Sequence, residues 1–269
     1  MAPKINKINK IEEDMLNDFD CQQLSFLGKS KPVYIAGEGP AVIVMSEMPG
    51  IYERVAFFAR RVRDAGFTVL MPSLFGEPGR APAPGYTART IARACISREF
   101  RVFSSNRSSP VVDWLRALAR YGYSTCGEKG VGAIGMCFTG NFAINLMLEP
   151  CVLAPVLSQP SLPLGKAAGL NISTEDLASV KQRLDDEDLT VLAYRFSGDA
   201  LCKAERFAAY QAALGNRFCA KALPDDSART GMGMKPHSVV TLHLIDEAGQ
   251  PTRQALDEIL EFFRMRLKP

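Results

Sequence analysis

The sequence predicts an α/β fold with a mainly parallel central sheet and helices on both faces. Short apolar segments typical of strands alternate with segments of helical period, and this alternation favours a parallel sheet covered by helices. The chain has 269 residues, 47% of them hydrophobic, which is enough to bury about 75% of the surface of the unfolded chain. A disordered protein is therefore excluded. No long linker divides the elements, so we expect a single domain over residues 22–269.

The first half of the chain supplies four of the expected strands. Residues 1–21 contain an Ile-Asn-Lys repeat without a packing period, which predicts a flexible N-terminal extension. Short strands are expected over 24–27 and 32–35, and a glycine-rich turn precedes a buried strand over 41–45. Val55, Phe58 and Val62 have helical spacing, which predicts a helix over 52–65 that ends at Gly66. A buried strand over 68–71 follows.

The second half continues the alternation. Helices are expected over 89–100 and 111–120, the latter because Trp114, Leu115 and Leu118 form one stripe. Gly215 closes another expected helix. The remaining predicted strands are 131–134, 152–157, 190–194 and 217–223, and the remaining predicted helices are 138–148, 175–184, 201–214 and 254–267.

Composition excludes several classes of protein. The formal net charge is only +3, and basic residues mostly alternate with acidic ones, so a nucleic-acid partner is not expected. No apolar run approaches the length of a membrane span, and the N-terminus lacks a secretory signal. Seven scattered cysteines without a CxxC pair, together with two histidines, argue against a disulfide framework and a zinc site. We therefore expect a cytoplasmic protein without metal or cofactor.

Cys137 lies in the most informative stretch of the sequence. An expected buried strand leads directly into an apolar helix through a sharp turn centred on Cys137, with Gly135 two positions before it. A nucleophile elbow needs small residues at such a turn, and the following helix N-terminus favours a thiolate. Most cysteines are inert buried thiols, but the strand-turn-helix context favours a nucleophile here. Thr139 departs from the pattern because an elbow usually has glycine at that position.

A thiol nucleophile needs a base, and the chain has only His237 and His243. His237 lies in a loop after the last expected strand, where an α/β sheet presents its catalytic residues. His243 lies in an alternating stretch and suits a packed or surface position. We therefore expect His237 to be the base, although a loop histidine can also be merely solvated.

Asp199 is the expected third member, because it follows a strand and lies between the nucleophile and the histidine in chain order. The competing interpretation is a helix N-cap, since aspartate is favoured there and a helix is expected from about residue 201. Asp225 and Asp226 are weaker candidates because they share the long loop with His237.

On these residues the sequence resembles the dienelactone hydrolase family, cysteine hydrolases of the α/β-hydrolase fold, from about residue 30 to the C-terminus. Four motifs carry this resemblance: the elbow Gly135-Met136-Cys137-Phe138-Thr139-Gly140, the acid in Ser197-Gly198-Asp199, the base in Pro236-His237-Ser238, and the segment Ser46-Glu47-Met48-Pro49-Gly50. The resemblance implies that Glu47 contacts the resting thiol of Cys137. An acid near a helix N-terminus would explain Glu47 without a catalytic role.

The resemblance implies acyl transfer on a small ester or lactone. The thiolate of Cys137 would attack the carbonyl, Asp199 would orient His237, and the backbone N–H groups of Phe138 and Met48 would form the oxyanion hole. The family's arginine shortly after the catalytic histidine is missing, because the sequence there is Ser-Val-Val-Thr. Dienelactone itself is therefore a doubtful substrate.

An arginine-rich segment could compensate for the missing arginine. Six arginines fall within residues 80–107, beside a single acid, and the segment is suited to a lid. Arg93 and Arg98 are the candidates for binding an anionic substrate, although solvated helix faces more often explain such spacing.

Two further functions remain open at this stage. The chain could be a fold relative without turnover that binds small molecules or senses oxidants through Cys137, because Thr139 and the missing arginine permit it. Nucleic-acid binding through the arginine-rich segment is a third and weaker hypothesis. Nothing in the sequence assigns an oligomeric state.

Overall fold

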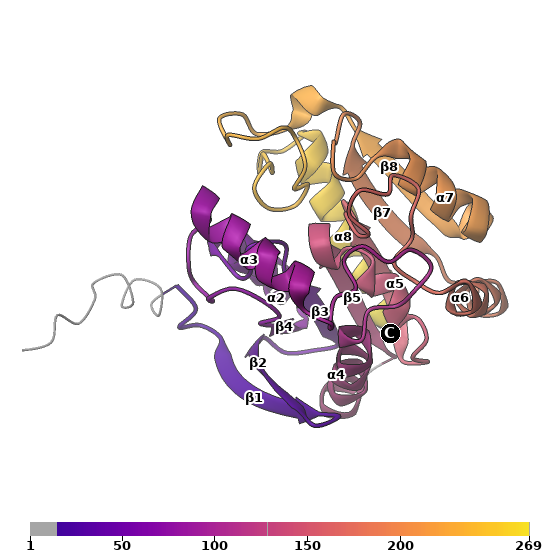
Figure 1. Cartoon of the computed structure of the whole chain (residues 1–269). Helices are drawn as coiled ribbons and strands as arrows, with labels where there is room; N and C mark the ends of the chain where they lie inside the picture. The colour runs from indigo at the N-terminus through magenta and orange to yellow at the C-terminus, as the bar shows by residue number, and fades with distance from the viewer. Residues whose placement is uncertain (1–14, 128, 269) are drawn as a thin grey trace, which may run out of the picture.

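One sheet of eight strands organises the computed structural model, which describes residues 15–127 and 129–268 (Figure 1). Its strand order is β1-β2-β4-β3-β5-β6-β7-β8. The strands are β1 (Asp20–Phe26), β2 (Lys29–Ala36), β3 (Ala41–Met45), β4 (Thr68–Pro72), β5 (Val131–Met136), β6 (Val152–Ser158), β7 (Val191–Phe196) and β8 (Phe218–Leu223).

Strand directions confirm the predicted, mainly parallel sheet. β1 pairs antiparallel with β2, and β2 pairs antiparallel with β4. All other neighbours, from β4 through β8, pair in parallel. Because parallel strands end on the same side, the loops that follow β3, β5, β7 and β8 meet at one edge of the sheet.

Helices cover both faces of the sheet, as predicted. In β3, Ala41, Ile43 and Met45 face one core and Val42 and Val44 the other, as the two-residue period of a strand requires. α4, α5, α6 and α7 pack on the first face, and α2 and α8 pack on the second. Their bounds are α2 (Glu53–Asp64), α4 (Val111–Cys126), α5 (Phe142–Leu146), α6 (Thr174–Asp186), α7 (Ala204–Leu214) and α8 (Pro251–Leu267). None of the helices described is long and apolar enough to cross a membrane.

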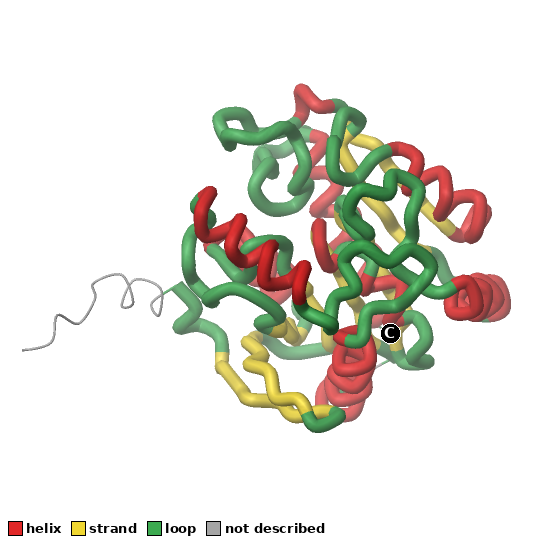
Figure 2. The backbone as a smooth tube through the Cα atoms, in the orientation of Figure 1, coloured by secondary structure: helices red, strands yellow, loops and turns green. Residues whose placement is uncertain are grey.

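The remaining helix, α3 (Pro84–Ile96), lies earlier in the chain than the helix expected over 89–100. Pro84 begins the helix because proline suits the first helical position, where its missing N–H is not needed. Ser97 adopts an extended backbone and ends it. Long loops over 97–110, 159–173 and 224–250 contain little regular structure, and they appear green in Figure 2.

The expected flexible extension over 1–21 is wrong for its last residues. Leu16 and Phe19 are buried in the core beneath α2, and β1 already begins at Asp20. Asp18 pairs with Arg60 at 2.7 Å and with Arg63 at 2.6 Å. The two buried apolar side chains and the two ion pairs of Asp18 hold residues 16–19 against the domain. The rest of that expectation concerns residues 1–14, which lie outside the described residues.

Candidate active site

Cys137 stands on a strained turn at the carboxyl end of β5. Its φ of +53° lies in the left-handed region that non-glycine residues rarely adopt. A Cβ at Gly135 would lie 2.2 Å from the Thr139 carbonyl oxygen, and one at Gly140 would lie 2.5 Å from the Pro160 Cα. Only glycine fits these two positions. The expected helix over 138–148 is divided into a 3-10 turn (Cys137–Thr139) and α5.

Thr139 replaces the usual elbow glycine and has a structural role. The hydroxyl Oγ1 accepts a hydrogen bond from the Met136 N–H at 3.0 Å and donates to the Met45 carbonyl at 2.9 Å. The side chain is fully buried. Thr139 therefore ties the end of β3 to the turn after β5, and holds the two strand ends that carry Glu47 and Cys137 together.

Replacing Thr139 by valine should lower the free energy of unfolding by about 1–3 kcal/mol, because the Met136 N–H and Met45 carbonyl would be buried without partners. Urea unfolding followed by circular dichroism would measure the loss. Thr139→Ser is the matched control, since it keeps the hydroxyl. Equal stability of the valine and serine variants would contradict this role.

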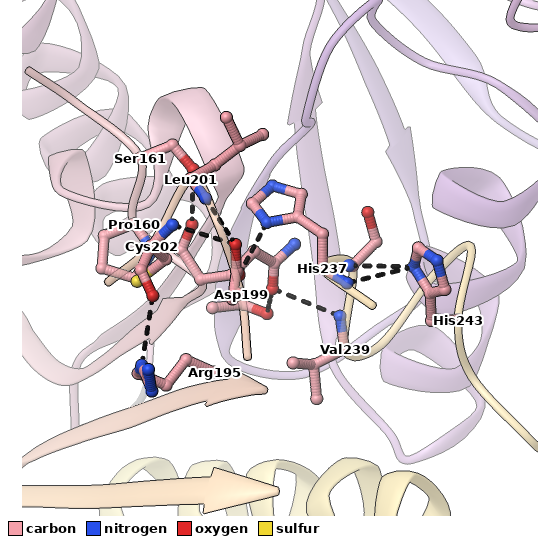
Figure 3. Close-up of polar contacts among 12 residues, drawn as sticks. Pro160, Ser161, Arg195, Asp199, Leu201, Cys202, His237, Val239 and His243 are labelled. Carbon is pink, nitrogen blue, oxygen red and sulfur yellow. Dashed lines mark hydrogen bonds and ion pairs between the residues drawn. The ribbon is translucent and has the colours of Figure 1, made fainter. Parts of the chain in front are cut away.

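His237 and Asp199 form a buried pair. His237 Nδ1 lies 2.7 Å from Asp199 Oδ2, and each residue is 4% exposed (Figure 3). The other carboxylate oxygen accepts hydrogen bonds from the N–H groups of Leu201 and Cys202, at 2.8 and 3.0 Å. Helix α7 begins only at Ala204, so Asp199 is not its N-cap. The carboxylate is fixed by the backbone on one side and orients the imidazole on the other.

The electrostatics of His237 involve Cys137. Burial alone would lower the pKa of His237, but the negative charge of Cys137 and the hydrogen bond to Asp199 outweigh it and hold the pKa well above the usual 6.5. The second ring nitrogen, Nε2, is buried and makes no hydrogen bond of regular geometry to the residues that the structure describes. This nitrogen is available to exchange a proton at the site.

The Cys137→Ala variant should show a lower pKa at His237, because the thiolate charge is the strongest influence raising it. Because the pKa of His237 is higher in the folded than in the unfolded state, its protonation stabilises the fold. This contribution is complete below about pH 6.5 and is lost as the pH rises through the folded-state pKa. Ring-proton NMR titration measures the change directly, since the chain has only two histidines.

His243 and the half-buried Cys151 supply the controls for this titration. Burial lowers the pKa of His243, so its signals should titrate below those of His237. Cys151→Ala should leave both titrations unchanged. An unchanged His237 titration in Cys137→Ala would mean that no thiolate charge acts on the ring.

His243 supports the loop that carries His237. Its Nδ1 accepts hydrogen bonds from the backbone N–H groups of Ser238 at 3.1 Å and His237 at 3.4 Å (Figure 3). An accepting Nδ1 requires an unprotonated nitrogen there, in agreement with the lowered pKa of this buried ring. His243 therefore holds the histidine loop and is not paired with an acid as His237 is.

Asp225 and Asp226, the weaker candidates for the acid, belong to a 3-10 turn over Asp225–Ser227. Asp225 accepts a hydrogen bond from the Gly198 N–H at 2.8 Å. A Cβ at Gly198 would collide with the Asp225 carboxylate, at 2.1 Å. Asp225 thus holds the turn that leads to Asp199, and does not itself bond to the histidine.

Glu47 lies buried at the end of β3 and receives hydrogen bonds from four side chains. Tyr52 donates at 2.5 Å, Ser238 at 2.6 Å and Gln159 at 3.2 Å, and Thr241 also donates. Two of these donors, Ser238 and Thr241, belong to the loop that carries His237. Among the described residues, the hydrogen bonds of Glu47 join it to this loop, to Tyr52 and to Gln159, and not to the thiol of Cys137.

Met48 and Phe138, whose N–H groups were expected to form the oxyanion hole, both line the cavity that contains Cys137. Within the described part of the chain, neither N–H donates to a turn or loop carbonyl. Their role as oxyanion-hole donors stays a prediction.

The cavity beside Cys137 has a volume of about 620 Å³. Its floor contains Cys137, His237 and Glu47, and its walls come from the loop after β3, from α3, and from the loops after β6, β7 and β8. Pro84, Thr87, Ala88 and Ile91 of α3 lie over one side. The expected lid segment therefore contributes a wall of the site.

A sequence model described as the dienelactone hydrolase family matches residues 26–163, just over half of the chain. The chain belongs to the dienelactone hydrolase family. No protein with a curated description matches it in a sequence search.

Solved structures resemble this member of the dienelactone hydrolase family over nearly their whole length. A candidate dienelactone hydrolase from Klebsiella pneumoniae has a TM-score of 0.62 and 17% identity, covering 91% of this chain and 97% of its own. A dienelactone hydrolase-like promiscuous phosphotriesterase from metagenomic libraries has a TM-score of 0.58 and 16% identity, with 93% and 99% covered. Est1E from Butyrivibrio proteoclasticus has a TM-score of 0.56 and 12% identity, with 91% and 98% covered. At such identities the likeness shows a shared α/β-hydrolase fold, and with the family match it makes the chain a hydrolase of this type.

The structure does not bring the two arginine candidates of this dienelactone hydrolase family member into the cavity. Arg93 and Arg98 are exposed, and neither lines the hollow that contains Cys137. Arg93 lines a separate hollow of about 210 Å³ with Glu77, Tyr86 and Phe100. Helical geometry explains this, because Ile91 and Thr87 occupy the cavity side of α3 and Arg93 points elsewhere.

Several residues that shape the site were not expected from the sequence. Gln159 contacts Glu47 and also accepts a hydrogen bond from the Val239 N–H at 3.3 Å. Arg206, from α7, holds the loops that form the cavity wall. Only Ser238 had a local signal, since it adjoins His237. No group of three His, Cys, Asp or Glu side chains suited to a metal ion occurs in the described ranges.

Proposed function

We propose that the protein hydrolyses small esters or lactones by nucleophilic catalysis, with Cys137 as nucleophile, His237 as proton carrier and Asp199 as the orienting acid. One observation carries the proposal: the buried pair of His237 and Asp199, 2.7 Å apart, adjoins a cavity whose floor holds Cys137 on a strained elbow. A histidine oriented by a carboxylate beside an elbow thiol is the arrangement that acyl transfer requires.

In the proposed reaction, the Cys137 thiolate attacks the carbonyl carbon and forms a C–S bond. The N–H groups of Met48 and Phe138 stabilise the oxyanion. His237 then donates its proton to the leaving oxygen as the C–O bond breaks, which leaves a thioester. Water attacks the thioester while neutral His237 accepts a proton from it. The acid departs, and the thiolate and protonated His237 are restored.

Glu47 is assigned a positioning role in this reaction. Its carboxylate accepts hydrogen bonds from Ser238 and Thr241, which follow His237 in the same loop. Gln159, in the loop after β6, donates to the same carboxylate. These bonds hold the loop that carries His237 in place. The role implied by the family, a direct contact with the resting thiol, stays a prediction.

Trapping the acyl-enzyme tests the proposal. Intact-mass and peptide mass spectrometry after rapid acid quenching with p-nitrophenyl butyrate should find one butyryl group on Cys137. His237→Ala should slow formation of this adduct, since the thiolate loses its charged partner and leaving-group donor. Release of p-nitrophenol without an adduct on Cys137, in a quench faster than turnover, would refute the nucleophile.

The alternative of a thiol sensor predicts a different pattern. Dilute peroxide should then oxidise Cys137 much faster than Cys95 or Cys151, with no ester turnover. All seven cysteines are free thiols, so we also propose that the protein works in a reducing compartment such as the cytoplasm.

A further inference from the structure

The cavity above Cys137 is lined almost entirely by apolar side chains. The apolar lining includes Met48, Ile91, Phe138, Leu164, Met232 and Leu242. Its polar side chains are fewer, namely Glu47, Tyr52, Thr87, Cys137, Ser161, His237 and Ser238. An acyl chain extending from the Cys137 carbonyl would therefore contact hydrocarbon.

No arginine or lysine belongs to the lining of this cavity among the described residues. Besides Cys137 and His237, its ionisable side chains are the Tyr52 hydroxyl and the Glu47 carboxylate, and neither supplies a positive charge that would attract an anion. Arg206 lies nearby, but its guanidinium already donates to five backbone carbonyls. Lys166 and Lys203 line an adjoining hollow that shares Leu164 and Leu201 with this cavity. Lys235 follows the lining residue Met234 in the chain, but it is exposed and is not part of the lining.

The rim of the cavity is also apolar. Leu201 and Met234 are 48% and 47% exposed, and both line the cavity. An apolar substrate group that contacts them would remove this exposed hydrocarbon from water. The rim and the wall thus suit the same kind of substrate.

From the lining, the rim and the missing cation we infer that the site takes esters with an uncharged, apolar acyl chain and rejects acyl groups that carry a carboxylate. This inference rests on the proposed ester hydrolysis. It departs from the anionic substrate that the arginine-rich segment predicted. A carboxylate in this cavity would lose its water without gaining a partner, which is the most unfavourable way to bury a charge.

The test compares two esters of matched shape, p-nitrophenyl 6-methylheptanoate and mono-p-nitrophenyl adipate. The second has a carboxylate where the first has a branched methyl end. We expect kcat/KM to be at least about 100-fold higher for the neutral ester. The p-nitrophenyl ester of monomethyl adipate is polar but uncharged, so it separates charge from polarity. Its kcat/KM should be within about tenfold of that for the 6-methylheptanoate ester. Values of kcat/KM for the charged and neutral esters within about threefold of each other would overturn the inference.

Ile91 offers a matched pair of variants, since its half-buried side chain reaches the cavity from α3. Ile91→Lys supplies the missing cation, and Ile91→Gln supplies polarity without charge. The lysine variant should shift the preference toward the adipate ester by about tenfold or more relative to the glutamine variant. No shift between them would count against the inference.

Binding without turnover separates this inference from the proposed function. In Cys137→Ala, thermal shifts with 6-methylheptanamide and with adipamic acid measure recognition alone. Selective stabilisation by the neutral amide supports the inference even where no ester is hydrolysed, and in that case only the proposed function fails. Rapid hydrolysis of both esters, with equal thermal shifts, supports the proposed function and overturns the inference.

Discussion

Alanine at position 137 is expected to lower kcat for p-nitrophenyl esters by at least about 10,000-fold, because the remaining groups cannot form a thioester. The residual rate would come from the N–H groups of Met48 and Phe138 and from binding in the apolar cavity. The KM should change much less than kcat, since Cys137 forms only a small part of the cavity wall. Steady-state kinetics on a neutral ester measures both.

The double variant Cys137→Ala/His237→Ala sharpens this prediction. Members of one catalytic unit are strongly non-additive, so the double variant should be no slower than Cys137→Ala alone. Cys151→Ala is the matched control, because it removes a half-buried thiol that does not line the cavity, and it should retain the wild-type rate. A Cys137→Ala enzyme within about tenfold of the wild type would exclude the thiol as nucleophile.

The proposed nucleophile could be located from sequence because its requirements are local. Gly135 and Gly140 lie within three residues of Cys137, so they leave a readable pattern in the chain. The restriction at Gly135 comes from Thr139 close by, and that at Gly140 comes from Pro160 in the next loop. The strands and the parallel sheet were predictable for the same reason, since a strand's apolar pattern is local. The pairing of His237 with Asp199 needed chain order as well, and the structure joins them across 38 positions.

The partners of Glu47 could not be predicted in this way. Ser238 and Thr241 lie more than 190 positions away from Glu47, and nothing in a serine or threonine marks it as a carboxylate donor. The predicted arginines do not line the cavity, for a related reason. Sequence proximity placed Arg93 in the lid, but the helix turned Ile91 and not Arg93 toward the cavity.

Arg206 was likewise invisible in the sequence, yet it predicts the largest stability effect. It is 1% exposed, and all five of its N–H donors meet backbone carbonyls. The acceptors are the carbonyls of Pro160, Pro163, Lys166, Gly169 and Leu201, at 2.7–3.3 Å. Burial lowers the pKa of this guanidinium, and the nearby Asp199 carboxylate opposes the shift without cancelling it. One side chain therefore holds the 159–173 loop against the turn that leads from Asp199.

Arg206→Met should lower the free energy of unfolding by about 3–5 kcal/mol, since it removes the donors of five carbonyls, and the hydrogen bonds to Pro160 and Pro163 are buried. Arg206→Lys should recover little of this loss. The three N–H donors of an ammonium share one nitrogen, so they cannot reach five acceptors arranged around a planar guanidinium. Urea unfolding at a fixed pH measures all three proteins. The loosened loop carries Ser161 and Leu164 of the cavity wall, so KM for neutral esters should also rise.

Arg183→Met is the matched control for this prediction. Arg183 also donates to three backbone carbonyls, those of Met147, Glu149 and Pro150. Its side chain is 13% exposed and also pairs with Glu187, so water can replace the lost donors there. The loss should be about 1 kcal/mol. If both methionine variants lost the same stability, the buried hydrogen bonds of Arg206 would not be the cause, and the loop would be held by its apolar contacts instead.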